Sequence, residues 1–151
     1  MLRTRISDAL KVAMKSKETH VVSTIRLIMA ALKDRDIAAR PKGNGDGIGD
    51  DEILSMLQSM IKQRRESVEM YEKGGRTELA AQEASEIGII QTFLPEQMDD
   101  AALSAAVQEI VKEAGAKTLK DMGRIMGLLK ERYAGQMDFS KASTQVKNQL
   151  S

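Results

Sequence analysis

The stretch that most constrains the fold of this chain is residues 61–97, which reads IKQRRESVEMYEKGGRTELAAQEASEIGIIQTFLPEQ. A polar helical pattern runs into Gly74 and Gly75, and a second helical pattern leads from there to Pro95. Glycine readily takes the left-handed conformation that ends a helix, and proline disfavours helical geometry in the residue before it. The stretch therefore predicts an antiparallel pair of helices followed by a break in the chain.

The rest of the sequence also shows helical periodicity and no convincing strand. Apolar residues recur at intervals of three and four, and a loop with several glycines fills residues 40–49. Only two Phe and two Tyr are present beside ten Met, so the core is expected to be aliphatic. We predict an all-α protein with helices over about residues 2–13, 21–39, 50–73, 77–92, 100–114, 118–133 and 140–150.

The break at Pro95 divides the expected helices between two domains. Residues 1–95 are expected to form a four-helix bundle-like N-terminal domain, and residues 96–151 a small three-helix C-terminal domain. Within the second domain, residues 96–114 carry five acids and one base, whereas residues 115–151 carry seven bases and three acids. The basic tail is therefore the part of the chain suited to meeting a polyanion.

Composition and motifs exclude several kinds of chemistry. Cysteine is absent, which rules out disulfides, thiolate metal sites and a cysteine nucleophile. The single histidine, His20, is expected to be a surface or capping residue, and residues 43–47 lack the ending of a P-loop and are expected to be a linker. No apolar run approaches the roughly 20 residues of a membrane helix, and residues 1–17 show no signal peptide. We expect no cofactor, no metal, no membrane partner and a cytoplasmic location.

Charged residues occupy inward positions of the expected helical pair. Ile61 and Val68 mark the inward stripe of the first helix, and Arg64 stands between them. Across the antiparallel pair, the matching inward positions hold Glu83 and Glu86. We predict a partly buried structural ion pair between Arg64 and Glu83 or Glu86. The alternative is that these side chains extend to solvent at the edge of the stripe.

Two glycines interrupt the expected helix over residues 118–133. Gly123 and Gly127 each cost about 1 kcal/mol of helix stability relative to alanine. Their spacing clears one face of the helix, so either a second helix or a phosphate–sugar chain can approach the backbone closely. The candidate nucleic-acid-binding residues are these two glycines, which we call the glycine face, and the cations expected to surround them: Lys117, Lys120, Arg124, Lys130 and Arg132.

Several longer motifs occur together in one order. They are RLIMAALK at residues 26–33, KQRRES at 62–67, YEKGGRTELAAQEASEI at 71–87, FLPEQ at 93–97 and DMGRIMG at 121–127. With this set the chain resembles a free-standing GatB/YqeY protein over nearly its whole length. The resemblance implies an N-terminal helical bundle and a three-helix tail related to the tail of the B subunit of the tRNA-dependent Asp/Glu amidotransferase.

In that family the tail helps to hold tRNA, and the catalytic centres lie in other domains and subunits. The resemblance therefore implies a non-catalytic tRNA-binding or amidotransferase-associated module with no catalytic residue of its own. Its expected partner is tRNA, and aminoacyl-tRNA synthetase or amidotransferase components are further candidates. Carried over to this sequence, the tail motif falls on Met122, Gly123, Arg124 and Met126.

Two other functions stay open. One is a carbon–nitrogen ligase that uses glutamine as amide donor, although neither a nucleophile nor a phosphate site is evident in the sequence. The other is a protein-interaction adaptor that uses the outer face of the third helix, formed by Lys62, Arg65, Glu69 and Glu72. The tail offers only Tyr133 and Phe139 as aromatic residues, so RNA recognition would depend on shape and phosphates, with strong dependence on salt.

Overall fold

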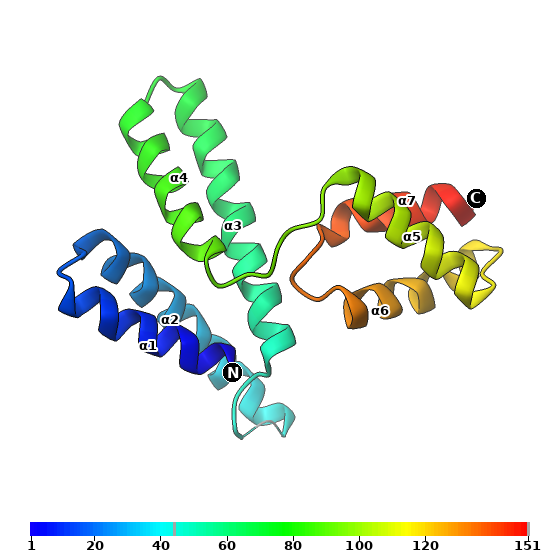
Figure 1. Cartoon of the computed structure of the whole chain (residues 1–151), viewed down its shortest axis with the longest axis horizontal. Helices are drawn as coiled ribbons and strands as arrows, with labels where there is room; N and C mark the ends of the chain where they lie inside the picture. The colour runs from blue at the N-terminus through cyan, green and yellow to red at the C-terminus, as the bar shows by residue number, and fades with distance from the viewer. Residues whose placement is uncertain (44, 151) are drawn as a thin grey trace. The chain divides into compact units, whose positions relative to one another are not determined.

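The computed structural model describes residues 1–43 and 45–150. Within these residues the chain forms seven α-helices, two short 3-10 helices and no strand (Figure 1). The prediction of an all-α protein is therefore confirmed. The elements are α1 (Leu2–Lys15), α2 (Thr19–Ala39), η1 (Arg40–Lys42), α3 (Asp50–Lys73), α4 (Thr77–Gln91), α5 (Asp100–Ala114), η2 (Leu119–Asp121), α6 (Met122–Arg132) and α7 (Phe139–Leu150).

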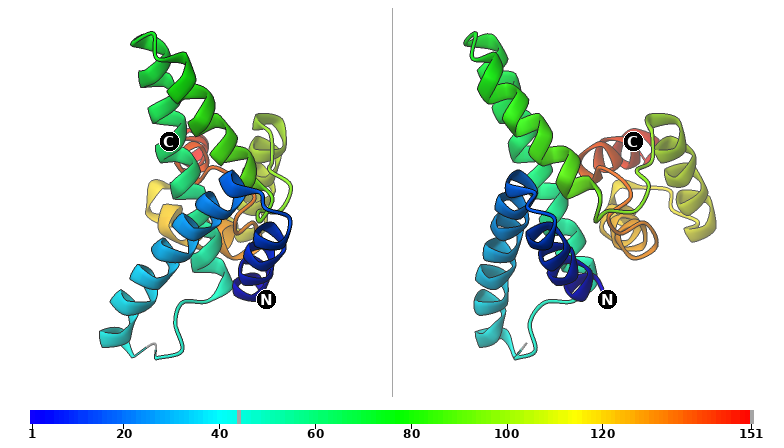
Figure 2. Two further views of the ribbon diagram at one scale, coloured as in Figure 1. Left: turned by 90° about the vertical axis from the view of Figure 1, so that its left-hand side faces the viewer. Right: turned by 60° about the vertical axis from the view of Figure 1, so that its left-hand side comes forward.

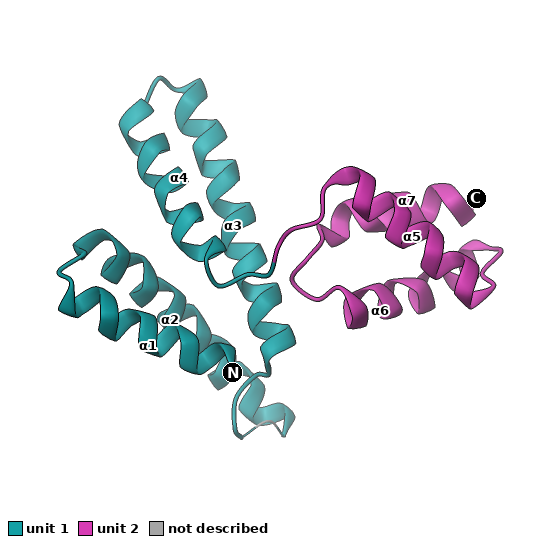
Figure 3. Ribbon diagram, viewed as in Figure 1, with its two compact units in different colours: residues 1–95 teal, residues 96–151 magenta. Residues whose placement is uncertain are grey.

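The chain divides into two compact units, which Figure 3 distinguishes by colour. Unit 1 comprises Met1–Pro95 and contains α1 to α4, and unit 2 comprises Glu96–Ser151 and contains α5 to α7. Each unit has its own cluster of buried aliphatic side chains. The two cores follow from the sequence, because apolar residues recur on one side of every helix.

Unit 1 consists of two helical pairs, α1 with α2 and α3 with α4, which lie side by side within each pair (Figure 2). The second pair is formed where Gly75, with a φ of +72°, ends α3 and reverses the chain. The two pairs share one core to which all four helices contribute, and α2 also contacts α4. Fully buried members of this core include Ile6, Ile25, Ile28, Ile53, Met56, Leu57 and Ile90.

An ion pair stands where the buried stripe of α3 ends. Ile61 is the last buried residue of that helix, and the next inward position is Arg64. Its Nε donates to Oε2 of Glu86 at 3.0 Å, and the two side chains are only 14% and 11% exposed. Glu86 is opposite Arg64 because both lie equally far from Gly75 along the chain. Glu83 lies nearly one turn nearer to Gly75, and the structure pairs Arg64 with Glu86 instead.

A second polar cluster joins three segments that are far apart in the sequence. Arg3 of α1 donates from Nη1 and Nη2 to the two oxygens of Asp36 of α2, at 2.7 and 3.0 Å. Nη2 also donates to the carbonyl of Ile48 at 3.0 Å, and the Ile48 amide donates to Asp36 at 2.9 Å. This Arg3 cluster (Arg3, Asp36 and Ile48) attaches the loop before α3 to the ends of α1 and α2.

Gly47 allows that loop to approach the Arg3 cluster. Its φ is +91°, and a Cβ added there would lie 2.6 Å from Oδ1 of Asp36 and 2.8 Å from Nη2 of Arg3. Only glycine meets both conditions at once. The segment expected to be a simple linker therefore packs closely against the Arg3 cluster at Gly47 and Ile48.

Unit 2 packs α5, α6 and α7 around a core that includes Val107, Ile110, Ile125, Leu129 and Val146. The Asp99 side chain accepts from the Ala102 amide at 2.7 Å and begins α5, and Gly115, with a φ of +63°, ends that helix. The predicted helix over residues 118–133 differs in the structure, because its first turn is the 3-10 helix η2. Beside this turn, the Asp121 carboxylate accepts a hydrogen bond from the Lys117 amide at 3.2 Å.

The Arg64–Glu86 pair leads to a prediction about stability. Glu86→Leu leaves a mostly buried guanidinium without its carboxylate, so we expect a loss of about 3 kcal/mol in the free energy of unfolding. The double variant Arg64→Met/Glu86→Leu should recover most of this loss, because desolvation offsets much of the attraction within a buried pair. Urea unfolding followed by circular dichroism measures both.

The exposed pair of Glu69 and Lys73, at 3.2 Å, provides the matched control. Glu69→Leu should change the free energy of unfolding by less than about 0.5 kcal/mol, since exposed pairs contribute little. If Glu86→Leu behaves like Glu69→Leu, the buried pair does not stabilise unit 1.

The Arg3 cluster predicts a dependence of stability on pH. The hydrogen bond from Arg3 lowers the pKa of Asp36, and the Ile48 amide and the charge of Arg3 add to this effect. The carboxylate therefore stabilises the fold above its unfolded pKa of about 3.9, and this contribution is lost as the pH falls through the lower folded pKa.

Asp36→Asn should lower the free energy of unfolding at neutral pH by about 1–2 kcal/mol and reduce its fall on acidification below about pH 4. Urea unfolding at several pH values tests this. Asp34→Asn, on the exposed side of α2, is the control and should keep the acid dependence of the unchanged protein. The same acid dependence in both variants would contradict the assignment to Asp36.

Candidate nucleic-acid interface

The glycine face of α6 is open. Both Gly123 and Gly127 are exposed, and a Cβ built on either one would meet no atom within 4 Å outside its own surroundings in the helix. The glycines therefore do not serve tight packing against a neighbouring helix of unit 2. The helix backbone at these two glycines is therefore accessible to a group from outside the unit.

Burial of the opposite side of α6 fixes the direction of this face. Ile125 and Leu129 have no exposed surface and belong to the core of unit 2. Each of them lies about 160° around the helix from Gly127, by the rotation of about 100° per residue. The glycine face therefore points away from the core of unit 2 for as long as this core is formed.

Two cations flank the glycine face along α6. Arg124 and Lys130 each lie three residues from Gly127, so they stand about 60° to either side of it. Both are exposed, and Lys130 forms no ion pair among the residues that the structure describes. Arg124 donates from Nη2 to Oδ1 of Asp121 at 3.2 Å while its side chain stays 53% exposed.

Asp121 organises the approach to α6. Its carboxylate accepts from the Lys117 amide at 3.2 Å as well as from Arg124. The pKa of Asp121 is lowered, first by the backbone hydrogen bond from Lys117 and then by that from Thr118 and by Arg124. This carboxylate therefore holds the loop that presents Lys117 and Lys120, both of which are exposed.

Arg132 does not lie beside the glycine face. It lies five residues beyond Gly127, about 140° away around the helix. Its Nη1 donates to Oε2 of Glu113 on α5 at 2.7 Å, so its guanidinium is directed toward α5. Nearness along the chain had grouped Arg132 with the other cations, and its position around the helix separates it from them.

Sequence reasoning also missed neighbours of the glycine face. Glu131 lies four residues after Gly127 and is exposed, so an acid shares this side of α6 with the cations. Leu119 is 48% exposed and stands one turn before Gly123. The face is therefore a bare backbone strip with cationic, acidic and apolar residues along its edges. Helical position, counted from Gly127, is the signal in the sequence that would have identified Glu131.

The aromatic residues of unit 2 do not form a stacking platform. Tyr133 and Phe139 are half-buried and pack against the core of the unit. Base stacking on aromatic rings is a common means of single-strand recognition. These two rings are therefore engaged by the core of unit 2 and are not arranged for base stacking.

The other residues singled out from the sequence have ordinary surroundings. His20 shares a hydrogen bond of 2.9 Å with Ser85, which joins α2 to α4. Lys62, Arg65, Glu69 and Glu72 are exposed on α3. Among the described residues no group of His, Asp and Glu has the arrangement of a metal site. No helix in the described part of the chain is long and apolar enough to cross a membrane.

The open surroundings of Gly127 give a direct test of its geometry. Gly127→Ala adds a methyl group to open space in a helix interior, so it should raise the free energy of unfolding of unit 2 by about 0.5–1 kcal/mol. Gly115→Ala is the matched control and should be destabilising, because Gly115 has a φ of +63°. Thermal unfolding of both variants measures the effect, and a lower melting temperature for Gly127→Ala would show that the face is packed.

Comparison with known proteins agrees with the motifs in this chain. The sequence pattern described as "Yqey-like protein" matches residues 3–150. An uncharacterized protein of Schizosaccharomyces pombe is 30% identical over 96 residues, which are 64% of this chain and 71% of that protein. "Altered inheritance of mitochondria protein 41, mitochondrial" of Pyrenophora tritici-repentis is 27% identical over 94% of this chain and 78% of its own length.

The protein of the same name from Lachancea thermotolerans is 30% identical over 74% of this chain, and the match spans only 61% of that relative. The names of these relatives contradict the cytoplasmic location expected from the sequence, because they describe mitochondrial proteins. The resemblance in the motifs is confirmed. Since the family pattern covers nearly all residues, the chain belongs to the YqeY-like protein family.

Proposed function

We propose that this chain is a non-catalytic module that binds tRNA through the glycine face of α6. The observation that carries the proposal is the open backbone at Gly123 and Gly127. Gly127 lies in the interior of α6, where glycine costs about 1 kcal/mol of helix stability, whereas Gly123 lies in the first turn of the helix. Because both glycines are exposed, packing inside unit 2 does not offset this loss of helix stability. Close contact with a molecule outside the unit offsets it.

The charges around this face favour an anionic ligand. Lys117, Lys120 and Lys130 form no ion pair among the described residues, and Arg124 keeps half of its side chain exposed beside Asp121. Lysine and arginine contact phosphate oxygens, and their binding releases counterions from the nucleic acid. The exposed Glu131 limits the net charge, so the proposal depends on close fit at the glycines as well as on attraction.

Folded RNA suits the shape of the surface. The A-form minor groove is wide and shallow, and it presents ribose hydroxyls and phosphates that proteins recognise by shape. A helix without side chains along one strip can lie closer to such a surface than an ordinary helix. The family resemblance supports tRNA in particular, because the related tail domain of the amidotransferase B subunit helps to hold tRNA.

This proposal predicts salt-dependent binding of total tRNA by the full chain. Three or four phosphate contacts should lower the affinity roughly 40- to 150-fold between about 50 and 200 mM salt. Arg124→Glu/Lys130→Glu should weaken binding at low salt by more than about tenfold, because both charges are reversed beside the contact. An electrophoretic mobility shift at two salt concentrations measures both effects.

Two controls separate this site from general attraction. Lys11→Glu/Lys15→Glu makes the same change of charge at exposed positions of α1. Gly127→Gln fills the glycine face without a charge, and Gly88→Gln does the same at an exposed glycine of α4 with open surroundings. The proposal requires the α6 variants to weaken binding and the matched variants to leave it intact. Equal effects in both sets, or no binding at low salt, would refute it.

A further inference from the structure

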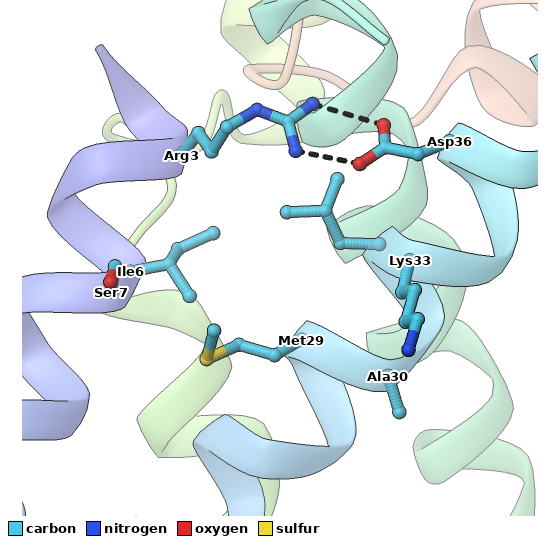
Figure 4. Close-up of a pocket in the computed structure, with 8 residues that line it drawn as sticks. Arg3, Ile6, Ser7, Met29, Ala30, Lys33 and Asp36 are labelled. Atoms are coloured by element: carbon cyan, nitrogen blue, oxygen red, sulfur yellow. Dashed lines mark hydrogen bonds and ion pairs between the residues drawn. The ribbon is translucent and has the colours of Figure 1, made fainter. Parts of the chain in front are cut away.

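A separate cavity of about 410 Å³ opens between α1 and α2 in unit 1 (Figure 4). Its volume lies in the range of small-molecule sites, which is roughly 300–1,000 Å³. None of the residues that line it belongs to the glycine face, and the proposed binding of tRNA leaves it without a role. The cavity combines an aliphatic floor with a charged rim, and these two parts indicate the chemistry of its ligand.

Met29 of α2 supplies most of the accessible apolar floor, and the lining also includes Leu32 of α2 and Ile6 of α1. Ile6 has no exposed surface and Leu32 is 6% exposed, so both are held by the core of unit 1. The side chains of Ile6 and Met29 point toward one another from the facing helices (Figure 4). Met29 is only partly buried, and its flexible thioether can adjust to an apolar group placed on it.

The rim has hydrogen-bond donors to spare and few acceptors. Asp36 already accepts from both amino groups of Arg3 and from the Ile48 amide, which uses three of its roughly four lone-pair positions. Arg3 still has its Nε–H, which donates to no acceptor among the described residues. Lys33, also on the rim, forms no ion pair within the described chain.

The charge balance of the rim also favours an anion. Arg3 and Lys33 carry two positive charges, and Asp36 carries one negative charge that is already engaged by Arg3. The Lys33 side chain is exposed and lies along α2 beside Ala30 (Figure 4). Its long stem can turn toward the cavity, since an exposed lysine has several accessible rotamers.

We propose that this cavity binds a small aliphatic carboxylate. The hydrocarbon chain of the ligand lies on Met29 and the exposed edge of Leu32, and its carboxylate accepts hydrogen bonds from Lys33 and from the free donors of Arg3. A cationic or neutral molecule of the same length meets a rim that has donors but hardly any free acceptor. The site therefore discriminates by the charge of the ligand head group, with the apolar floor contributing to each ligand alike.

Octanoate is a suitable probe, and the full chain with labelled methionine methyl groups gives a local signal in nuclear magnetic resonance. Met29→Leu identifies the Met29 resonance. Octanoate, below the concentration at which it forms micelles, should shift this resonance in a saturable way and leave that of Met126 in unit 2 unchanged. Octylammonium and octanol, which share the hydrocarbon chain, should bind much more weakly.

Lys33→Gln removes the charge and keeps most of the side-chain length. It should lower the affinity for octanoate about threefold to tenfold, as expected for a partly solvated charged hydrogen bond. Lys11→Gln, at an exposed position of α1 outside the cavity lining, should leave the affinity unchanged. Arg3 and Asp36 are left intact because they attach the loop before α3.

Three results would overturn the proposal. They are the absence of a saturable shift at Met29, equal binding of octanoate and octylammonium, and an affinity unchanged by Lys33→Gln. Each of these can occur whether or not unit 2 binds tRNA, so the two proposals fail independently.

Discussion

Burial of aliphatic side chains in two separate cores is the constraint on which the rest of this structure depends. Phe93 is the only aromatic residue among the described residues that are buried, and the others are mainly Ile, Leu, Met, Val and Ala. Each helix turns its apolar side toward the core of its own unit. The surfaces with a possible function are therefore the sides that these cores leave outward. The burial of Ile125 and Leu129 is what exposes Gly127.

Much of the fold could be predicted from the sequence, because the residues that begin, end and orient a helix lie close together in the chain. Apolar spacing, Gly75 after α3 and Asp99 before α5 each act within a few residues of their position. The position of Arg64 in an inward stripe could also be predicted from the sequence. Its pairing with Glu86 and not Glu83 depends on the register of the two antiparallel helices. The Arg3 cluster could not be predicted, because Arg3, Asp36 and Ile48 meet only in the folded chain.

The candidate site, like the fold, could be predicted only in part from the sequence. The openness of the glycine face depends on which side of α6 is buried, and apolar periodicity in the sequence contained that information. Nearness along the chain did not show which charged residues lie beside the glycine face. Arg132 turns to Glu113 on α5, and Glu131 joins the outward side. A contact with a residue on another helix was needed to place Arg132, whereas counting around α6 would have placed Glu131.

The two proposed sites use the fold in different ways. The glycines lower the stability of α6 and expose its backbone. A functional site often lowers the stability of a protein in this way. The cavity between α1 and α2 adds no such cost, because its floor is part of the core and its ion pair stabilises the loop before α3. A substitution in one unit is therefore expected to remove the binding proposed for that unit without affecting the binding proposed for the other.

The central claim is that an external polyanion approaches the bare backbone of α6, and amide resonances measure this most directly. The account predicts that titration of the full, nitrogen-15-labelled chain with tRNA at low salt shifts or broadens the amide signals of Gly123 and Gly127 first. Gly88 on α4 is also exposed with open surroundings and should respond little. A response at Gly88 equal to that at Gly127, or changes confined to unit 1, would contradict the account.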